Sequence, residues 1–138
     1  MNIKTEFLNI MAEQTEIALA TSINNVPNVR IVNFYFDSDE NILYFSSFKG
    51  NDKVKEIESN PYVAFTTIPH SGNEHVKGKG TVKKSSKTIF DVADHFIAKI
   101  PDYKNTIEFA GKSLILFELK FDTAIVTIDL HTIKTLKF

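Results

Sequence analysis

Apolar residues recur with helical spacing at the start of the chain and then gather in short runs that alternate with polar positions. The apolar side chains within Ile3–Gln14 lie close to the spacing of one helix face, which predicts an amphipathic helix. The later runs are rich in β-branched and aromatic residues and are separated by polar turns, which is typical of strands. We expect strands at Glu16–Ile23, Asn28–Phe36, Ile42–Ser47, Tyr62–Ile68 and His75–Lys84.

Helices are expected in three further places. Asn51 is a favourable N-cap for a helix over about Asp52–Glu58, and Pro61 helps to end it because the residue before a proline is driven out of the helical conformation. The remaining expected elements are a helix at Ser85–Ile100 ended by Pro101, a short helix near Tyr103–Phe109, one or two strands within Ser113–Leu130, and a last strand at His131–Phe138.

This order of elements gives six or seven strands with few helices between them. It lacks the regular strand and helix alternation of a doubly wound parallel sheet. Short strands in meander order favour a mainly β fold, an antiparallel barrel that is closed or nearly closed. Gly78 and Gly80 fall inside one predicted strand, which indicates bending or a close backbone approach there. No linker or internal repeat divides the chain, so we expect a single domain over residues 1–138.

Composition narrows the classes of function. Hydrophobic residues make up 43% of the chain and charged residues 24%, which is ordinary for a globular protein. The absence of cysteine excludes disulfides, thiolate nucleophiles and metal sites built on cysteine. A net charge of -1 gives no reason to expect nucleic acid or an anionic membrane as partner. Without a secretory signal or a membrane-spanning apolar run, we expect a cytoplasmic protein.

Candidate chemistry gathers at the turn within Tyr44–Ile57, where a predicted strand passes into a predicted helix. Lys49 and Lys53 flank Gly50 at this helix N-terminus, and free backbone N–H groups and the helix dipole favour a bound phosphate there. Arg30 is a cation inside a β-branched run, where it needs a partner. We expect the hairpin between the second and third strands to bring Arg30 to the same anion.

Other polar residues near this turn suit a heterocycle or a sugar. Ser46 and Ser47 end a predicted strand and can donate hydrogen bonds, and Asn33 can present an amide. The alternative is a solvated surface, on which Arg30 pairs with a surface carboxylate and the serines are ordinary strand-end residues. His70 and His75 flank a polar loop but lack supporting ligands, so no metal site is predicted.

The segment Asn28–Phe65 resembles the FMN-binding split-barrel family of the pyridoxamine 5′-phosphate oxidase type, and the resemblance extends over about Glu6–Lys84. Three motifs carry it. They are Arg30-Ile31-Val32 for the family's R-x-V stretch, Tyr44–Ser47 followed by Asn51–Lys53 for its strand end and Ser-Arg-Lys-type turn, and Asn60–Ala64 for its N-P-x-V-A stretch. The resemblance implies a split barrel that binds FMN.

The resemblance also implies roles for individual residues. Contacts to FMN are expected from Arg30, Val32, Asn33, Ser46, Ser47, Lys49, Asn51 and Lys53. Arg30, Lys53 and Asn51 would hold the phosphate. Val32 and Asn33 would line the flavin ring, and the two serines would touch the ring edge or the ribityl chain. Asp52 departs from the family, which often has a basic residue there, and Lys49 would compensate for its charge.

The function implied is an FMN-dependent oxidoreductase acting on a small molecule, with NADH or NADPH as a candidate reductant. The family also implies a homodimer with the cofactor at the subunit interface. The chain lacks the C-terminal R-L-x-P-type segment of true pyridoxamine phosphate oxidases, so vitamin B6 is not the expected substrate. Two alternatives stay open: a non-catalytic module that binds flavin, deazaflavin or haem for sensing, storage or transfer, and an interaction domain without a cofactor.

Overall fold

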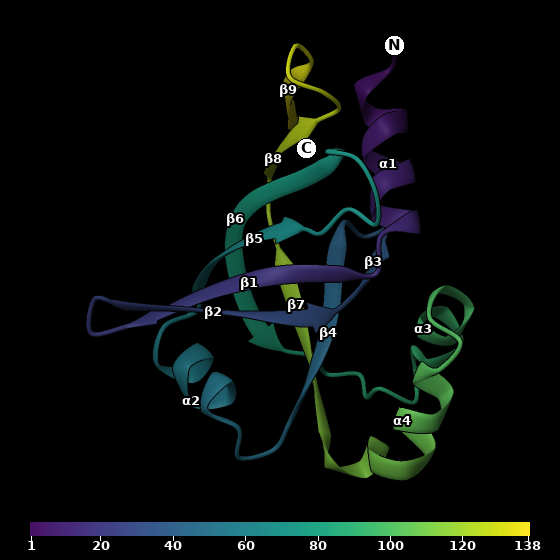
Figure 1. Cartoon of the computed structure of the whole chain (residues 1–138). Coiled ribbons are helices and arrows are strands. Elements are labelled where there is room, and N and C mark those ends of the chain that lie inside the picture. Colours follow the sequence, from purple (N-terminus) through teal and green to yellow (C-terminus); the bar gives the residue numbers. More distant parts are fainter.

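All nine strands belong to one antiparallel sheet in the computed structural model, which describes residues 1–138 (Figure 1). The strands are β1 (Glu16–Ile23), β2 (Val26–Asn33), β3 (Tyr35–Asp37), β4 (Ile42–Phe48), β5 (Tyr62–Thr67), β6 (His75–Lys84), β7 (Leu114–Lys120), β8 (Thr123–Thr127) and β9 (Ile133–Lys137). Their order across the sheet is β2-β1-β5-β6-β7-β4-β3, and β8 and β9 extend from β6. The predicted mainly β split-barrel fold is confirmed, with more strands than the six or seven expected.

The sheet curls into a barrel that stays open along one line. β2 and β3 lie at the two ends of the strand order, although only Phe34 separates them in the chain. β2 pairs with β1, whereas β3 pairs with β4. The predicted continuous strand Asn28–Phe36 is therefore wrong. Its two halves hydrogen-bond to different neighbours, and the fully buried ring of Phe34 holds the break in the core.

The glycines of β6 mark the place where that strand changes partners. His75–Gly78 pairs with β8, and Thr81–Lys84 pairs with β7. A Cβ atom added at Gly80 would overlap the carbonyl group of Lys120, so no larger residue fits without movement of the backbone. The predicted close backbone approach is confirmed at this position.

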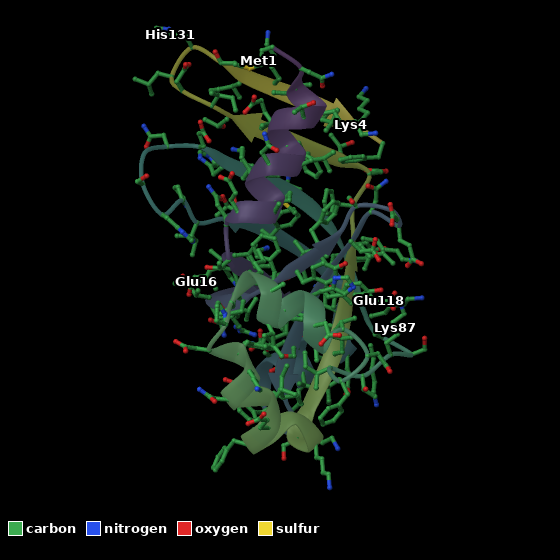
Figure 2. The ribbon with its side chains drawn as sticks, turned by 90° about the vertical axis from the view of Figure 1, so that its right-hand side faces the viewer. Met1, Lys4, Glu16, Lys87, Glu118 and His131 are labelled. Carbon is green, nitrogen blue, oxygen red and sulfur yellow. The ribbon has the colours of Figure 1, made fainter.

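Four α-helices and two apolar clusters complete the fold. The helices are α1 (Ile3–Glu13), α2 (Asp52–Ser59), α3 (Ala93–Lys99) and α4 (Tyr103–Ala110), and a 3₁₀ turn follows at Gly111–Ser113. The larger cluster fills the barrel and includes the buried faces of α1 and α2. The smaller cluster lies between α3, α4 and the strands β4 and β7. In Figure 1, α2 lies to one side of β4 and the pair α3 and α4 to the other, and Figure 2 shows that pair from its outer side.

The helix predicted at Ser85–Ile100 is shorter than expected. Only Ala93–Lys99 is helical, and the preceding residues form turns fixed by their own side chains. The Ser85 hydroxyl accepts a hydrogen bond from the Lys87 N–H, and Asp91 accepts one from the Thr88 N–H. Such side-chain bonds compete with helix formation. The run Ser113–Leu130 forms two strands, β7 and β8. No helix is long and apolar enough to cross a membrane.

Candidate functional site

The opening of the barrel lies between β2 and β4. β4 pairs with β7 over its whole length but with β3 only over Ile42–Tyr44, and β2 pairs with β1 alone. The edge of β4 that faces away from β7 therefore has no strand partner over Phe45–Phe48, and the edge of β2 that faces away from β1 has none either. These two free edges lie near each other. Unpaired backbone N–H and C=O groups on such edges are available to a ligand. α2 begins just beyond the end of β4, so its N-terminus borders the same opening.

Arg30 projects from the inner face of β2 toward α2, on the same side as the buried Val32. One guanidinium nitrogen, Nη2, forms an ion pair with Oε2 of Glu56 at 3.1 Å. The other, Nη1, is buried and has no hydrogen-bond partner. Nη2 of Arg30 is thus bound within the protein, whereas Nη1 is a donor nitrogen that remains available to a ligand.

Lys53 lies in the first turn of α2 and is only 7% exposed. Its ammonium group makes no hydrogen bond or ion pair within the chain, whose one ion pair joins Arg30 and Glu56. Burial, reinforced by the positive charge of Arg30, lowers the pKa of Lys53 to about 8. A cation that has lost part of its contact with water without gaining a counter-ion is costly. An anion bound beside Lys53 would relieve that cost.

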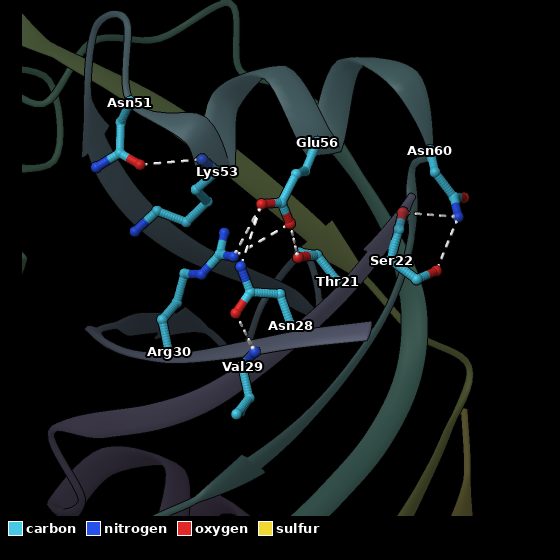
Figure 3. Close-up of polar contacts among 9 residues, drawn as sticks. All are labelled: Thr21, Ser22, Asn28, Val29, Arg30, Asn51, Lys53, Glu56 and Asn60. Atoms are coloured by element: carbon cyan, nitrogen blue, oxygen red, sulfur yellow. Dashed lines mark hydrogen bonds and ion pairs between the residues drawn. The ribbon is translucent and has the colours of Figure 1, made fainter. Parts of the chain in front are cut away.

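Glu56 is the residue of this site that sequence reasoning missed. Its carboxylate accepts hydrogen bonds from Thr21, Asn28 and Arg30, and Figure 3 shows these contacts in the space between α2 and β2. The hydrogen bond from Thr21 is the main cause that lowers the pKa of Glu56 below its usual value. A signal was present in the sequence, because Glu56 follows Lys53 by three residues and so shares its helix face.

Asn51 caps α2 as predicted, and its side chain keeps a free donor. The side-chain oxygen Oδ1 accepts a hydrogen bond from the Lys53 N–H at 2.9 Å. Its amide nitrogen, Nδ2, is not used in any hydrogen bond and points away from the Lys53 N–H in Figure 3. Gly50 has a positive φ of 77°, the left-handed region that glycine enters easily. Lys49 and Asp52 at the same turn are both exposed.

Ser46 and Ser47 point to opposite faces of β4, as neighbours in a strand must. The Ser46 hydroxyl is within 2.6 Å of the Tyr103 hydroxyl on α4, away from Arg30 and Lys53. The Ser47 hydroxyl is buried and has no partner. Asn33 likewise lies on the opposite face of β2 from Arg30. The structure therefore brings Arg30, Asn51 and Lys53 together, with Val32 on the same face of β2, whereas Ser46 and Asn33 lie apart from them.

The hairpin geometry expected for Arg30 needs correction. Of the predicted strand Asn28–Phe36, only the β3 part pairs with β4, and Arg30 lies on β2, which has no hydrogen bonds to β4. Arg30 meets the turn through α2 instead, because Glu56 of that helix holds its guanidinium. The alternative in which a carboxylate pairs with Arg30 is thus correct for one of its nitrogens, while the other is left unpaired.

The sequence matches the pyridoxamine 5′-phosphate oxidase-like family over residues 10–132, which is most of its length. No curated protein sequence matches it. Among solved structures, general stress protein 26 from Bacillus anthracis has the same fold, with a TM-score of 0.77, 17% identity and coverage of 100% of both chains.

Two further solved structures have names that mention a cofactor. A FAD-binding protein from Mesorhizobium loti has a TM-score of 0.68 and 16% identity, with 87% of this chain and 90% of that chain covered. A heme binding protein from Mycobacterium smegmatis has a TM-score of 0.80 and 10% identity, with 99% of this chain and 58% of that chain covered. At these identities the structures establish the fold alone. The match over residues 10–132 establishes the family: this chain is a member of the pyridoxamine 5′-phosphate oxidase-like family.

Proposed function

We propose that residues 1–138 form one FMN-binding domain, in which the cofactor occupies the opening between β2 and β4. One observation carries this proposal. Two cationic groups, the ammonium of the largely buried Lys53 and the buried Nη1 of Arg30, lack partners and lie at the N-terminus of α2. Phosphate supplies several acceptor oxygens and a negative charge, which is what two unpaired cationic donors need.

The chain's own residues divide into a phosphate end and a ring end. Arg30, Lys53 and the amide nitrogen of Asn51 would hold the phosphate, with exposed Lys49 adding a weaker attraction. The free edges of β2 and β4 continue from this point into the opening. There the backbone of Val32 and Asn33 would line the ring.

On the other side of the opening, the unpartnered hydroxyl of Ser47 would supply one hydrogen bond to the ring or the ribityl chain. Because the Ser46 hydroxyl is already hydrogen-bonded to the Tyr103 hydroxyl, Ser46 would contact the cofactor through its backbone.

FMN supplies hydride or electron transfer when it is bound, and the protein supplies orientation and electrostatics. We propose a small molecule as the electron acceptor or donor and NADH or NADPH as the reductant. Exclusion of bulk water strengthens the electrostatic interactions at a bound ring, and the buried Val32 and Ser47 would contribute to that here.

A homodimer is part of the proposal, because one sheet face is left uncovered. The outer faces of β2, β1 and β5 place Val29, Ala20 and Ala64 in one row and Ile31, Ala18 and Thr66 in the next. Val29 and Ile31 are 65% and 61% exposed. A contiguous apolar face of this kind is typical of an interface, and a second copy would meet it with the same residues about a two-fold axis. Because β2 borders the opening, such a dimer would place the cofactor near its interface.

The test is the visible spectrum of the purified protein, followed by titration with FMN. Wild-type protein should show a bound flavin spectrum, and the Arg30→Ala/Lys53→Ala double variant should lose at least about a hundredfold in affinity, since each charged hydrogen bond is worth about 1.5–3 kcal/mol. Unchanged affinity in the double variant would rule out this phosphate site. For the dimer, Ile31→Asp should convert the species seen by light scattering to a monomer.

A second candidate is cofactor binding without turnover, with haem or flavin as the ligand. It is favoured by the shared fold with the heme binding protein from Mycobacterium smegmatis. Reduction of the bound flavin by NADH or NADPH would support the oxidoreductase, whereas a bound flavin that neither nicotinamide reduces would support the binding module. A Soret band in place of a flavin spectrum would identify haem.

A further inference from the structure

We propose that Glu56 determines which flavin phosphates this protein accepts, by limiting the phosphate site to one net positive charge. The protein would then bind a singly charged phosphate, such as the phosphate nearer the ribityl chain in FAD, nearly as well as the doubly charged phosphate of FMN. This inference rests on the proposed flavin site and names its ligand selectivity.

The charges of the site give the first step. Arg30 and Lys53 contribute two positive charges, and the carboxylate of Glu56 removes one of them. The exposed pair at the same turn, Lys49 and Asp52, carries opposite charges that offset each other in solvent. The site around the bound group therefore has a net charge of about +1 at neutral pH, where Lys53 with its pKa of about 8 is still mostly protonated.

The second step is that Glu56 is fixed in place. Its two carboxylate oxygens are held by the Thr21 hydroxyl, by the Asn28 amide at 3.2 Å and by Nη2 of Arg30 at 3.1 and 3.3 Å. Those donors come from β1 and β2, so three contacts to two strands would have to break before Glu56 could turn away. A ligand thus meets Arg30 through its free Nη1 while Glu56 stays bound to Nη2.

The third step concerns the ligands. A phosphate monoester such as FMN carries about −1.5 to −2 charges near neutral pH, because its second pKa is about 6. Each phosphate of a dinucleotide is a diester and carries one charge. The doubly charged group would leave a residual negative charge beside Glu56 in a partly buried site, whereas the singly charged group would be neutralised. The carboxylate of Glu56 should therefore disfavour FMN more than FAD.

The experiment compares Glu56→Gln with wild type, and uses Glu58→Gln as the matched control. Glu58 is an exposed residue on the same helix, so its variant makes the same change in net charge away from the site. Dissociation constants for FMN, FAD and riboflavin are measured by flavin fluorescence at pH 7.5 and 0.15 M salt. Riboflavin reports the ring end alone, because it has no phosphate.

In Glu56→Gln we expect about tenfold tighter FMN and about threefold tighter FAD, since a removed charge acts in proportion to the charge of the ligand. Riboflavin affinity should stay constant, and Glu58→Gln should change none of the three. At pH 5.5, where the FMN phosphate is mostly singly charged, the gain for FMN should fall to the gain for FAD.

Three results would overturn the inference. Equal effects of Glu56→Gln and Glu58→Gln would mean that only the total charge of the protein matters. Weaker binding of FMN and FAD in Glu56→Gln would mean that Glu56 serves to position Arg30. A change in riboflavin affinity as large as that for FMN would place the effect at the ring. If wild-type protein binds no flavin at all, the proposed function itself fails, and the inference fails with it.

Discussion

Two lysines of this protein have lost much of their contact with water, and their surroundings differ in one respect. Lys99 on α3 donates a hydrogen bond to the Met11 carbonyl at 2.9 Å, and its ammonium lies 3.5 Å from the centre of the Phe34 ring. Lys53 on α2 has neither kind of contact and faces Arg30, another cation. Burial lowers the pKa of Lys99 to about 7, and burial together with Arg30 lowers that of Lys53 to about 8.

The comparison shows that a lowered lysine pKa does not by itself identify a ligand site. Lys99 connects the last turn of α1 to α3, because Met11 is one of the residues whose carbonyl has no partner within its helix. That contact accounts for its position in full. No hydrogen bond or ion pair within the chain explains the position of the Lys53 ammonium, so an outside anion is the simplest explanation of its burial. Unmet hydrogen-bonding capacity, more than the shifted pKa, separates the two lysines.

The largest expected effect is on FMN affinity, and it tests this difference between Lys53 and Lys99 directly. Lys53→Met should weaken FMN binding by about tenfold to a hundredfold, the value of a charged hydrogen bond of about 1.5–3 kcal/mol. Lys99→Met removes the same charge from a position where the ammonium already has partners within the protein. It should leave the FMN dissociation constant unchanged. Titration of both variants with FMN makes the comparison. Similar losses in the two variants would mean that FMN is not bound at Lys53.

The pH dependence of binding should follow Lys53. The ammonium loses its proton as the pH rises through about 8, so FMN affinity should be constant below that pH and fall above it. The fall should approach about tenfold per pH unit, as expected for one linked proton. Dissociation constants measured from pH 6.5 to 9.5 would show it. In Lys53→Met the curve should be flat above pH 8, and a fall of the same size in that variant would assign it to another group.

The pH dependence of stability should follow Lys99. Its pKa is about 7 in the folded protein and near the ordinary 10.5 in the unfolded chain, so the unfolded chain binds more protons between these values. Stability should then rise with pH through this window, by up to about 1.4 kcal/mol per pH unit. Urea unfolding at pH 6, 7, 8 and 9 measures it. The gain of Lys99→Met over wild type should be largest at pH 6 and shrink as pH rises, and a constant difference would contradict the prediction.

The smallest effect is expected at Lys49. It is exposed at the same turn as Lys53, and water and salt screen its charge. Lys49→Ala should weaken FMN binding by less than about threefold at 0.15 M salt, a change that should shrink further at 0.5 M salt. A loss as large as that of Lys53→Met would show that the phosphate lies outside the opening, at the exposed turn.

Much of the fold could be predicted from local pattern. The limits of α1, β1 and α2 agree closely with expectation, since the apolar spacing, the Asn51 cap and the proline after α2 act within a few residues. The break at Phe34 could not be predicted, because β2 and β3 read as one alternating run. Only the pairing of β2 with β1 and of β3 with β4 separates them.

The candidate site divides in the same way. The alternation of β2 places Arg30 and Val32 on one face, and alternation also requires Ser46 and Ser47 to diverge, a consequence that the grouping of the two serines overlooked. Glu56 is different. It lies 26 residues from Arg30 in sequence, and nothing local shows which carboxylate among many would reach that guanidinium. The three-residue spacing of Lys53 and Glu56 indicates only that they share a helix face, and it does not identify Arg30 as the partner of Glu56.

By itself, the sequence determined most of the strands, the capped helix after β4 and the family, because spacing, capping and turn chemistry depend on neighbours along the chain. The tertiary structure alone decided which groups are satisfied. It gave Lys99 a carbonyl and an aromatic ring, gave Nη2 of Arg30 a carboxylate, and left Lys53 and Nη1 of Arg30 without partners. The physical reason is that burial and hydrogen bonding of a side chain depend on residues distant in sequence, which meet only when the sheet curls and α2 packs beneath β2.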